Sequence, residues 1–307
     1  MYKKIVSLLP AATEIVCALG LEKNLVGRSH ECDFPESVKQ LPVCSEANFA
    51  DNLGSKEIDV KVKELLTDAL SVYTVNRELI KQLAPDIVIT QAQCEVCAVS
   101  LKDVEDALEN YLDKQARIIS LQPNSLDDVF RDIATIADAL NVTPVGNILL
   151  EELHQRVDII RHKLKFSENK PTVVCIEWLE PLMVSGNWVP ELVSIAGGTP
   201  ILTEAGKPSA YVQWEDICMF DPEILIIMPC GFPIERTLKE IDILFKLPGF
   251  AEMKAVKNKG VYIADGNQYF NRPGPRIVDS IEILAEIINP KQFVFGYEGN
   301  GWIRFSL

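Results

Sequence analysis

A segment near the middle of the chain, residues 143–166, limits most strongly how the rest can fold. Thr143 is a favourable N-cap, and Pro144 follows at the first helical position, where its missing N–H costs no hydrogen bond. The segment continues with apolar residues at helical spacing: Ile148, Leu149, Val157, Ile160 and Leu164. At about 1.5 Å per residue the helix would be roughly 30–35 Å long, the width of a small domain. We therefore expect a spine helix that joins two lobes.

Short apolar strands alternate with helices on both sides of the spine helix. The clearest strands are expected before it at residues 4–9 and 86–90, and after it at 172–178 and 223–228. Apolar runs of this kind, separated by helices, are typical of buried parallel sheets. The predicted fold is therefore α/β, with two parallel-sheet lobes joined by one long helix.

The spine helix also sets the expected domain boundaries. Residues 1–142 would form the N-terminal lobe, residues 143–168 the linking helix and residues 169–307 the C-terminal lobe. Ligands of parallel α/β sheets bind at the carboxyl ends of the strands. We therefore expect a ligand cleft between the lobes, lined by the loops that follow the strands.

One short pattern occurs once in each half of the chain. Glu78 precedes Pro85 by seven residues, and the run Pro-Asp-Ile-Val-Ile begins at that proline. Glu215 precedes Pro222 by seven residues, and the run Pro-Glu-Ile-Leu-Ile begins there. The shared order of a short helix, a proline and a buried strand indicates two lobes of common architecture.

Composition and charge argue against several classes of protein. The net charge is −14 and no stripe of lysine and arginine is present, which disfavours nucleic-acid binding. No apolar stretch reaches the roughly 18 residues of a membrane-spanning helix. The basic start imitates a signal peptide, but Pro10, Thr13 and Glu14 interrupt the apolar run that follows. As written, the chain is expected to be soluble and without a leader, which favours the cytoplasm.

Motifs of common enzyme classes are also missing from the sequence. It holds no nucleophile elbow, P-loop or Gly-x-Gly-x-x-Gly motif. Nothing in the spacing pairs a base with a nucleophile. Binding without chemistry is the expected function, and an enzyme with a cleft cysteine is the alternative.

Five stretches together resemble one protein family. They are Ile-Val-Ser-Leu-Leu-Pro-Ala-Ala-Thr-Glu at 5–14, the segment 25–35, the Pro-Asp strand at 85–89, the glycine pair at 197–198, and Arg-Pro-Gly-Pro-Arg at 272–276. They resemble the helical-spine, or class III, substrate-binding proteins of ABC importers, in the branch that binds cobalamin. The resemblance covers nearly the whole chain. It implies two lobes that close only slightly over a ligand, because the spine helix resists bending.

The resemblance also implies functional residues. Family members dock on arginines of the importer's permease through one exposed glutamate per lobe, and Glu78 and Glu215 match these by position. A plain helix-start role would also explain two acidic residues in first turns. The ligand contacts implied for the cobalamin branch are Tyr73, Gln91, Trp188, Tyr269, Phe270 and Arg272. Gln91 departs from the family, which often has an aromatic residue there.

The expected ligand is cobalamin or a related corrinoid. Flat aromatic rings and a few hydrogen-bond donors suit a large ring system rimmed with amides. A haem or a metal–siderophore chelate is the alternative ligand within the same family. The family analogy implies a protein outside the membrane, whereas the missing leader favours an intracellular one, so the compartment is left open.

Four of the eight cysteines follow predicted strands and are expected at the same cleft, beside a histidine: His30, Cys32, Cys94, Cys97 and Cys230. The Cys-x-x-Cys spacing of one pair occurs in metal and redox sites. These residues could bind Zn²⁺ or an iron–sulfur cluster, form a redox disulfide, or approach the metal of a bound tetrapyrrole. They could equally be small buried residues. A cytosolic thiol- or metal-dependent protein that kept the fold is therefore a further alternative function.

Overall fold

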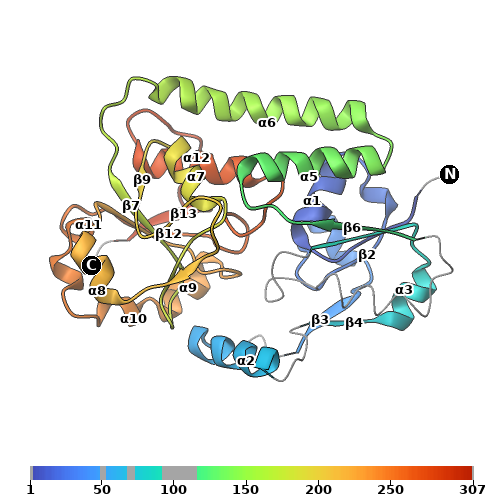
Figure 1. Ribbon diagram of the computed structural model, residues 1–307, viewed down its shortest axis with the longest axis horizontal. Helices are drawn as coiled ribbons and strands as arrows, with labels where there is room; N and C mark the ends of the chain where they lie inside the picture. The colour runs from blue at the N-terminus through green and yellow to red at the C-terminus, as the bar shows by residue number, and fades with distance from the viewer. Residues whose placement is uncertain (1–2, 49–52, 68–72, 92–115, 306–307) are drawn as a thin grey trace. The chain divides into compact units, whose positions relative to one another are not determined.

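The computed structural model describes residues 3–48, 53–67, 73–91 and 116–305 (Figure 1). Contacts divide the chain into two compact units. The N-terminal unit comprises Met1–Leu53, Glu57–Pro123 and Asp127–Glu151, and the C-terminal unit comprises Gly54–Lys56, Asn124–Leu126 and Glu152–Leu307. Each unit combines helices with a sheet that has a parallel core, which confirms the predicted α/β class.

The N-terminal unit is organised around a four-stranded sheet in the order β2-β1-β5-β6. Its strands are all parallel: β1 (Ile5–Ser7), β2 (Leu25–Arg28), β5 (Ile87–Gln91) and β6 (Arg117–Leu121). The central strands place Val6 opposite Val88, and both side chains are fully buried. Burial of the central strands explains their nearly continuous apolar sequence.

This part of the chain also contains several helices and a small antiparallel strand pair. The helices are α1 (Pro10–Ala18), α2 (Ser55–Thr67), α3 (Arg77–Leu83) and α5 (Leu126–Ala139), with 3-10 turns at η1 (Glu22–Asn24) and η2 (Glu36–Gln40). The antiparallel pair is β3 (Ser45–Ala47) with β4 (Tyr73–Val75). Helix α1 begins at Pro10, where the missing N–H of proline is tolerated, so the chain passes from strand β1 into a helix within three residues.

The C-terminal unit contains a mixed sheet in the order β10-β8-β7-β11-β12-β13, with β9 paired to β7. The parallel core consists of β7 (Thr172–Trp178), β11 (Ile224–Ile227) and β12 (Val261–Ala264), joined by the short parallel strand β9 (Thr199–Pro200). The outer strands are antiparallel: β8 (Met183–Val184), β10 (Ala210–Tyr211) and β13 (Trp302–Phe305). This lobe therefore has the predicted parallel core, with antiparallel strands added at both edges of the sheet.

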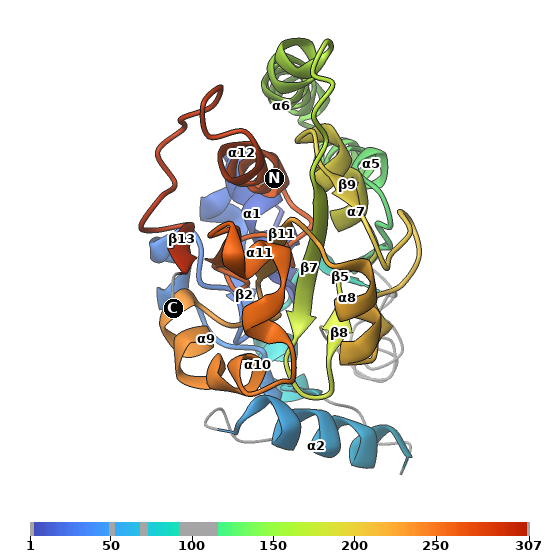
Figure 2. The ribbon, with the colours of Figure 1, turned by 90° about the vertical axis from the view of Figure 1, so that its left-hand side faces the viewer.

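The helices of the C-terminal unit surround the strands of its sheet (Figure 2). They are α7 (Val189–Ile195), α8 (Trp214–Phe220), α9 (Ile234–Glu240), α10 (Asp242–Phe245), α11 (Lys254–Lys257) and α12 (Ile277–Ile288), with a 3-10 turn at η3 (Phe250–Glu252). Eleven of the twelve residues of α12 are buried, which explains its apolar sequence. The chain then returns as β13, which pairs Phe305 with Val261.

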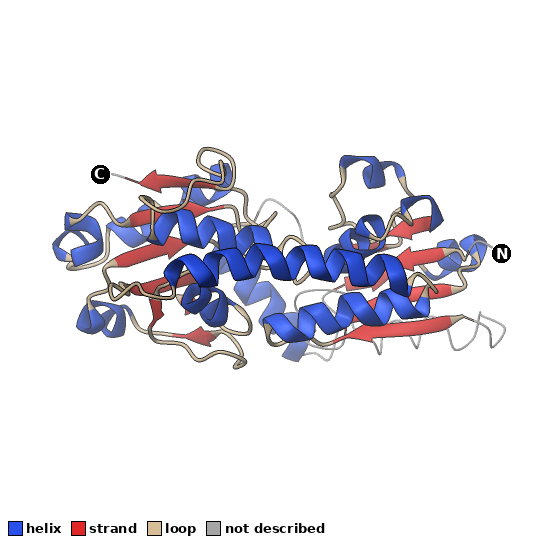
Figure 3. Cartoon of the chain, turned by 90° about the horizontal axis from the view of Figure 1, so that it is seen from above, coloured by secondary structure: helices blue, strands red, loops and turns tan. Residues whose placement is uncertain are grey.

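The predicted spine helix is present as α6 (Thr143–Leu164), one continuous helix of 22 residues. The division between the two units falls inside it, between Glu151 and Glu152. Its first part lies beside α5 (Figure 3), where a Cβ added to Gly146 would come within 2.5 Å of the Cβ of Ala137. Its second part is held by Arg156, which forms ion pairs with Asp279 and Glu282 of α12. The helix therefore takes part in both units.

The predicted internal repeat is visible as matching helix–strand pairs. Helices α3 and α8 are each seven residues long, and Glu78 and Glu215 are the second helical residue of each. Each helix ends at a left-handed residue, Ala84 with φ 46° or Asp221 with φ 45°. A proline and a buried strand, β5 or β11, follow in each unit.

The acidic residue after each proline has the same structural role in both units. Oδ2 of Asp86 accepts a hydrogen bond from the backbone N–H of Lys4 at 2.7 Å. Oε2 of Glu223 accepts one from the backbone N–H of Thr172 at 3.0 Å. Each carboxylate thus satisfies a donor where the neighbouring central strand begins, which accounts for the Pro-Asp and Pro-Glu pairs.

The described residues include no helix that is both long and apolar enough to cross a membrane.

Candidate ligand-binding and docking sites

The loop after β2 places His30 and Glu31 against Tyr73 of β4 in the N-terminal unit. The ring centroids of His30 and Tyr73 lie 5.3 Å apart. Nδ1 of His30 is 3.0 Å from the hydroxyl oxygen of Ser45, which fixes the orientation of the imidazole. The Tyr73 hydroxyl donates to Oε1 of Glu31 at 3.3 Å. An imidazole and a phenol therefore lie side by side just beyond the carboxyl end of β2.

Cys32 belongs to a buried network next to this group. The Thr13 hydroxyl oxygen is 2.9 Å from Oγ of Ser7 and 3.1 Å from Sγ of Cys32. All three side chains are fully buried. The network packs the start of α1 against the end of β1, which gives Cys32 a packing role, and its role as a metal ligand stays a prediction.

Gln91, the other predicted contact of the N-terminal unit, ends strand β5. Its side chain is buried, as is that of Tyr73. Both residues therefore expose only a small part of their side chains within this unit.

In the C-terminal unit, Trp188 and the loop after β12 are tied together. Nε1 of Trp188 donates to the carbonyl oxygen of Phe270 at 2.6 Å. The backbone N–H of Phe270 donates to Oγ of Ser280 at 2.9 Å. The Phe270 ring is only 1% exposed, so it belongs to the core. The expectation that this ring faces a ligand is corrected: Phe270 positions the loop through its backbone.

The same loop holds a buried cation beside an acidic turn. Nη2 of Arg272, a residue only 7% exposed, donates to Oδ1 of Asn267 at 3.0 Å. Asp265 accepts hydrogen bonds from the backbone N–H groups of Asn267 and Gln268 at 2.9 and 2.7 Å. Burial raises the pKa of Asp265, although these hydrogen bonds and the charge of Arg272 oppose the rise. The loop is therefore organised before any ligand binds.

Tyr269 extends the aromatic surface of this loop. Its half-buried ring meets the ring of Tyr297 edge-on at a centroid distance of 5.9 Å. The guanidinium of Arg276 lies 5.6 Å from the Tyr269 ring centroid. Loop 265–272 therefore combines the half-buried Tyr269 ring with the amide of Asn267 and the guanidinium of Arg272. Sequence reasoning missed Asp265 and Asn267, which the polar run Asp-Gly-Asn-Gln after an apolar strand would have indicated.

The cysteines give no complete metal site in the described part of the chain. No group of three or more histidine, cysteine, aspartate or glutamate side chains suited to a metal ion occurs among those residues. Cys230 is half-buried in the loop after β11, and it belongs to the C-terminal unit, whereas His30 belongs to the N-terminal unit. The predicted ligands Cys94 and Cys97 lie outside the described residues.

Both candidate docking glutamates are exposed on short, well-capped helices. The side chain of Asn76 accepts from the N–H of Leu79 at the start of α3, and Gln213 and Asp216 form a reciprocal capping box at the start of α8. Over residues 3–48, 53–67, 73–91 and 116–305, neither Glu78 nor Glu215 forms a salt bridge. Two equivalent carboxylates therefore face solvent without a basic partner from those residues.

Comparison with known proteins extends over most of the chain. Residues 5–267 match a family model described as periplasmic binding protein. An uncharacterized ABC transporter substrate-binding lipoprotein of Bacillus subtilis is 25% identical over 298 residues, covering 95% of this chain and 81% of the relative. The vitamin B12-binding protein of Vibrio cholerae is 24% identical over 293 residues, covering 94% of this chain and 90% of the relative.

A solved structure shows the same fold. The periplasmic heme-binding protein of Roseiflexus sp. RS-1, in its apo form, aligns with a TM-score of 0.71 at 21% identity, covering 94% of this chain and 99% of that one. The family model spans far more than half of the sequence. The chain therefore belongs to the periplasmic binding protein family, as a substrate-binding protein of the helical-spine class that ABC importers use.

Proposed function

We propose that this chain binds a corrinoid such as cobalamin and delivers it to the permease of an ABC importer. The observation that carries the ligand assignment is loop 265–272, where aromatic rings and a buried guanidinium are held in place around Trp188. The relative from Vibrio cholerae, a vitamin B12-binding protein with similarity along 94% of this chain, supports the same ligand class.

The chemistry of the loop suits a corrinoid. A corrin ring has apolar faces and a rim of amides, so it needs aromatic surfaces and a few fixed polar groups. Tyr269 supplies a half-buried ring and Trp188 the small exposed part, 7%, of a mostly buried one, while Asn267 and Arg272 supply an amide and a guanidinium. Because these groups are already hydrogen-bonded into the fold, little conformational entropy is lost when a ligand binds.

Haem is the second candidate ligand, and one observation favours it. His30 and Tyr73 lie with their rings 5.3 Å apart in the N-terminal unit. Histidine and tyrosine are both axial ligands of haem iron in proteins. A protein with a heme-binding name also shares this fold.

Absorption titrations with cyanocobalamin and with hemin distinguish the two ligands. We expect a one-to-one corrinoid complex of micromolar or tighter affinity, and His30→Ala should leave that affinity unchanged. Haem would be assigned instead if hemin gave a Soret shift that His30→Ala or Tyr73→Phe abolishes, and if the protein did not bind cobalamin. Metal analysis of the purified protein tests the cysteine hypothesis, which requires stoichiometric zinc or iron.

We also propose that Glu78 and Glu215 dock the loaded protein on basic residues of the permease. The proposal is supported by their equivalent positions in the two repeats and by their exposure. Glu235 provides a matched control, since it is an exposed glutamate at the second residue of the seven-residue helix α9.

Docking can be measured on the importer reconstituted in nanodiscs. Glu78→Gln and Glu215→Gln should each weaken it about tenfold and reduce its salt dependence, because each removes one charge pair. Glu235→Gln should leave docking unchanged. Equal effects of all three substitutions would point to net charge alone and would refute specific docking by this pair.

A further inference from the structure

The two docking helices differ at equivalent positions beyond their shared glutamate. Counting from Glu78 in α3 and from Glu215 in α8, Lys81 corresponds to Cys218 and Gln82 to Met219. The N-terminal helix therefore has a polar surface where the C-terminal helix has sulfur-containing apolar side chains. Met219 is 73% exposed, although it is a large apolar residue.

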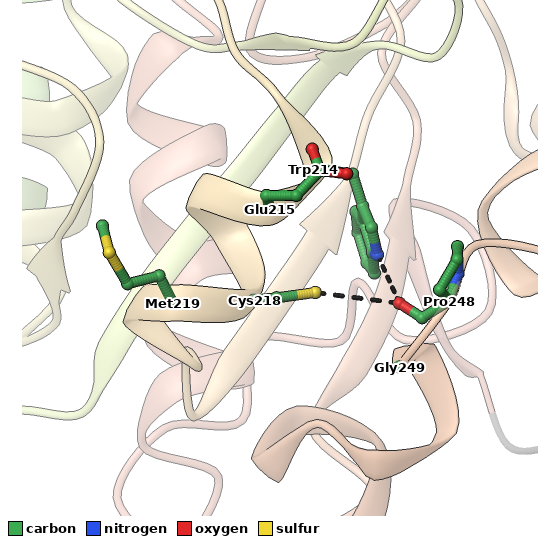
Figure 4. Close-up of a pocket in the computed structure, with 6 residues that line it drawn as sticks. All are labelled: Trp214, Glu215, Cys218, Met219, Pro248 and Gly249. Carbon is green, nitrogen blue, oxygen red and sulfur yellow. Dashed lines mark hydrogen bonds between the residues drawn. The ribbon is translucent and has the colours of Figure 1, made fainter.

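An open pocket of about 520 Å³ lies at this apolar surface, within the C-terminal unit. It is lined by Trp214, Glu215, Cys218, Met219, Pro248 and Gly249 (Figure 4). Nε1 of Trp214 and Sγ of Cys218 both donate to the carbonyl oxygen of Pro248, at 2.7 and 3.9 Å. These bonds hold the indole and the thiol against the segment before η3, so the pocket has a defined wall.

The charges around the pocket are acidic. Glu215 and Asp216 lie in the first turn of α8, Asp221 ends it, and the helix contains no basic residue. Lys254 lies 3.7 Å from Asp221 and partly balances that carboxylate. The acidic side chains raise the pKa of Cys218 further after burial has raised it, so this thiol remains neutral at neutral pH. The surface therefore combines a neutral apolar pocket with a free carboxylate at its rim.

We propose that this pocket receives an apolar side chain of the permease, adjacent in the permease to the basic residue that pairs with Glu215. The inference rests on the proposed docking function and deepens it. A basic partner segment satisfies the carboxylate rim, and its apolar neighbour fills the pocket beside Cys218 and Met219. Because α3 carries Lys81 and Gln82 instead, the two docking helices are not interchangeable, and the protein docks in one orientation.

Exchanging the two sulfur-containing side chains for polar ones tests the pocket. The double variant Cys218→Ser/Met219→Gln changes one half-buried and one exposed residue, so the fold should be retained. A thermal melt of the variant checks this. We expect docking on the nanodisc importer to weaken about tenfold, equivalent to about 1.4 kcal/mol. The loss should persist at high salt, since burial of apolar surface is not screened. Lys81→Ser/Gln82→Ala in α3 is the matched control and should change docking less than twofold.

The outcomes separate this inference from the function on which it rests. If Glu215→Gln weakens docking and the double variant does not, the pocket inference is overturned while docking by the glutamates stands. If neither weakens docking, both are overturned. Light scattering could instead show concentration-dependent dimerisation that Met219→Gln abolishes while docking is unchanged. That result would assign the pocket to a second copy of this chain and would also overturn the inference.

Discussion

Replacing Arg156 should strongly destabilise the packing of the spine helix against α12. Nε of Arg156 donates to Oε1 of Glu282 at 2.9 Å, and Nη2 reaches Oε2 of Glu282 at 2.6 Å and Oδ1 of Asp279 at 2.5 Å. The Tyr297 hydroxyl donates to the same Glu282 carboxylate at 2.9 Å. One guanidinium therefore neutralises two carboxylates of α12.

The magnitude follows from the burial of these groups. Removing one partner of a buried ion pair costs about 3–5 kcal/mol, because the remaining charge is left without compensation. The side chains of Asp279 and Glu282 are 17% and 9% exposed, but that of Arg156 is 36% exposed, so solvent screens part of the loss. We expect Arg156→Ala to lower the free energy of unfolding by about 2–4 kcal/mol.

The pH dependence of this loss provides a second readout. Burial raises the pKa of Asp279 even though Arg156 opposes the rise, and removal of the arginine should raise it further. The folded variant would then bind protons more readily than the unfolded chain. Its free energy of unfolding should therefore increase as the pH falls from about 8 to 5, and the deficit relative to the unmodified chain should shrink.

Urea unfolding followed by circular dichroism measures both effects. Arg161→Ala is the matched control on the same helix, since Arg161 lies 3.7 Å from Asp158 in an exposed pair. That change should cost less than about 0.5 kcal/mol. Equal losses for the two arginine variants, or a deficit for Arg156→Ala that grows as the pH falls, would refute the reasoning.

Three further predictions concern packing and titration inside the units. Gly146→Val should lower the free energy of unfolding in urea by about 1–3 kcal/mol, because the new Cβ would overlap the Cβ of Ala137. An unchanged urea midpoint would contradict the close contact of α5 and α6. Burial raises the pKa of the Cys175 thiol to about 12. Maleimide at pH 7.5 should therefore spare Cys175 in peptide mapping and modify the half-buried Cys218. Comparable labelling of both cysteines would show the burial of Cys175 to be wrong. Burial raises the pKa of Asp132 to about 7 in the folded chain. The contribution of Asp132 to the free energy of unfolding should therefore decline as the pH rises from about 4 to 7 and then level off, and Asp132→Asn should abolish that decline. An identical pH profile of the variant would exclude this titration.

Local signals made the spine helix and the repeat predictable from sequence. The bounds of α6 follow from a start signal at Thr143 and from apolar periodicity, both of which are properties of neighbouring residues. The matching helices around Glu78 and Glu215 follow from a proline at a fixed spacing before a buried strand. Such features depend little on the rest of the fold.

The errors concern features that distant residues determine. Strand β13 pairs Phe305 with Val261, a partner more than forty residues earlier, so no local pattern indicated it. Phe270 is buried because the loop turns its ring inward at φ 60°, while its backbone binds Trp188 and Ser280. No sequence pattern indicated that Cys218 lines an open pocket, because which face of α8 is covered depends on distant segments; Trp214 and Ile217 are its buried residues.

The contribution of Arg272 to ligand affinity tests the proposed function most directly. Calorimetric titration of cyanocobalamin into the unmodified chain should give one site of micromolar or tighter affinity. Arg272→Ala should weaken the affinity for cyanocobalamin at least tenfold, because the guanidinium and its hydrogen bond to Asn267 are lost. The control variant Arg161→Ala should bind cyanocobalamin as the unmodified chain does. Absence of cobalamin binding, or equal affinity of the Arg272 variant, would contradict a corrinoid site built on loop 265–272.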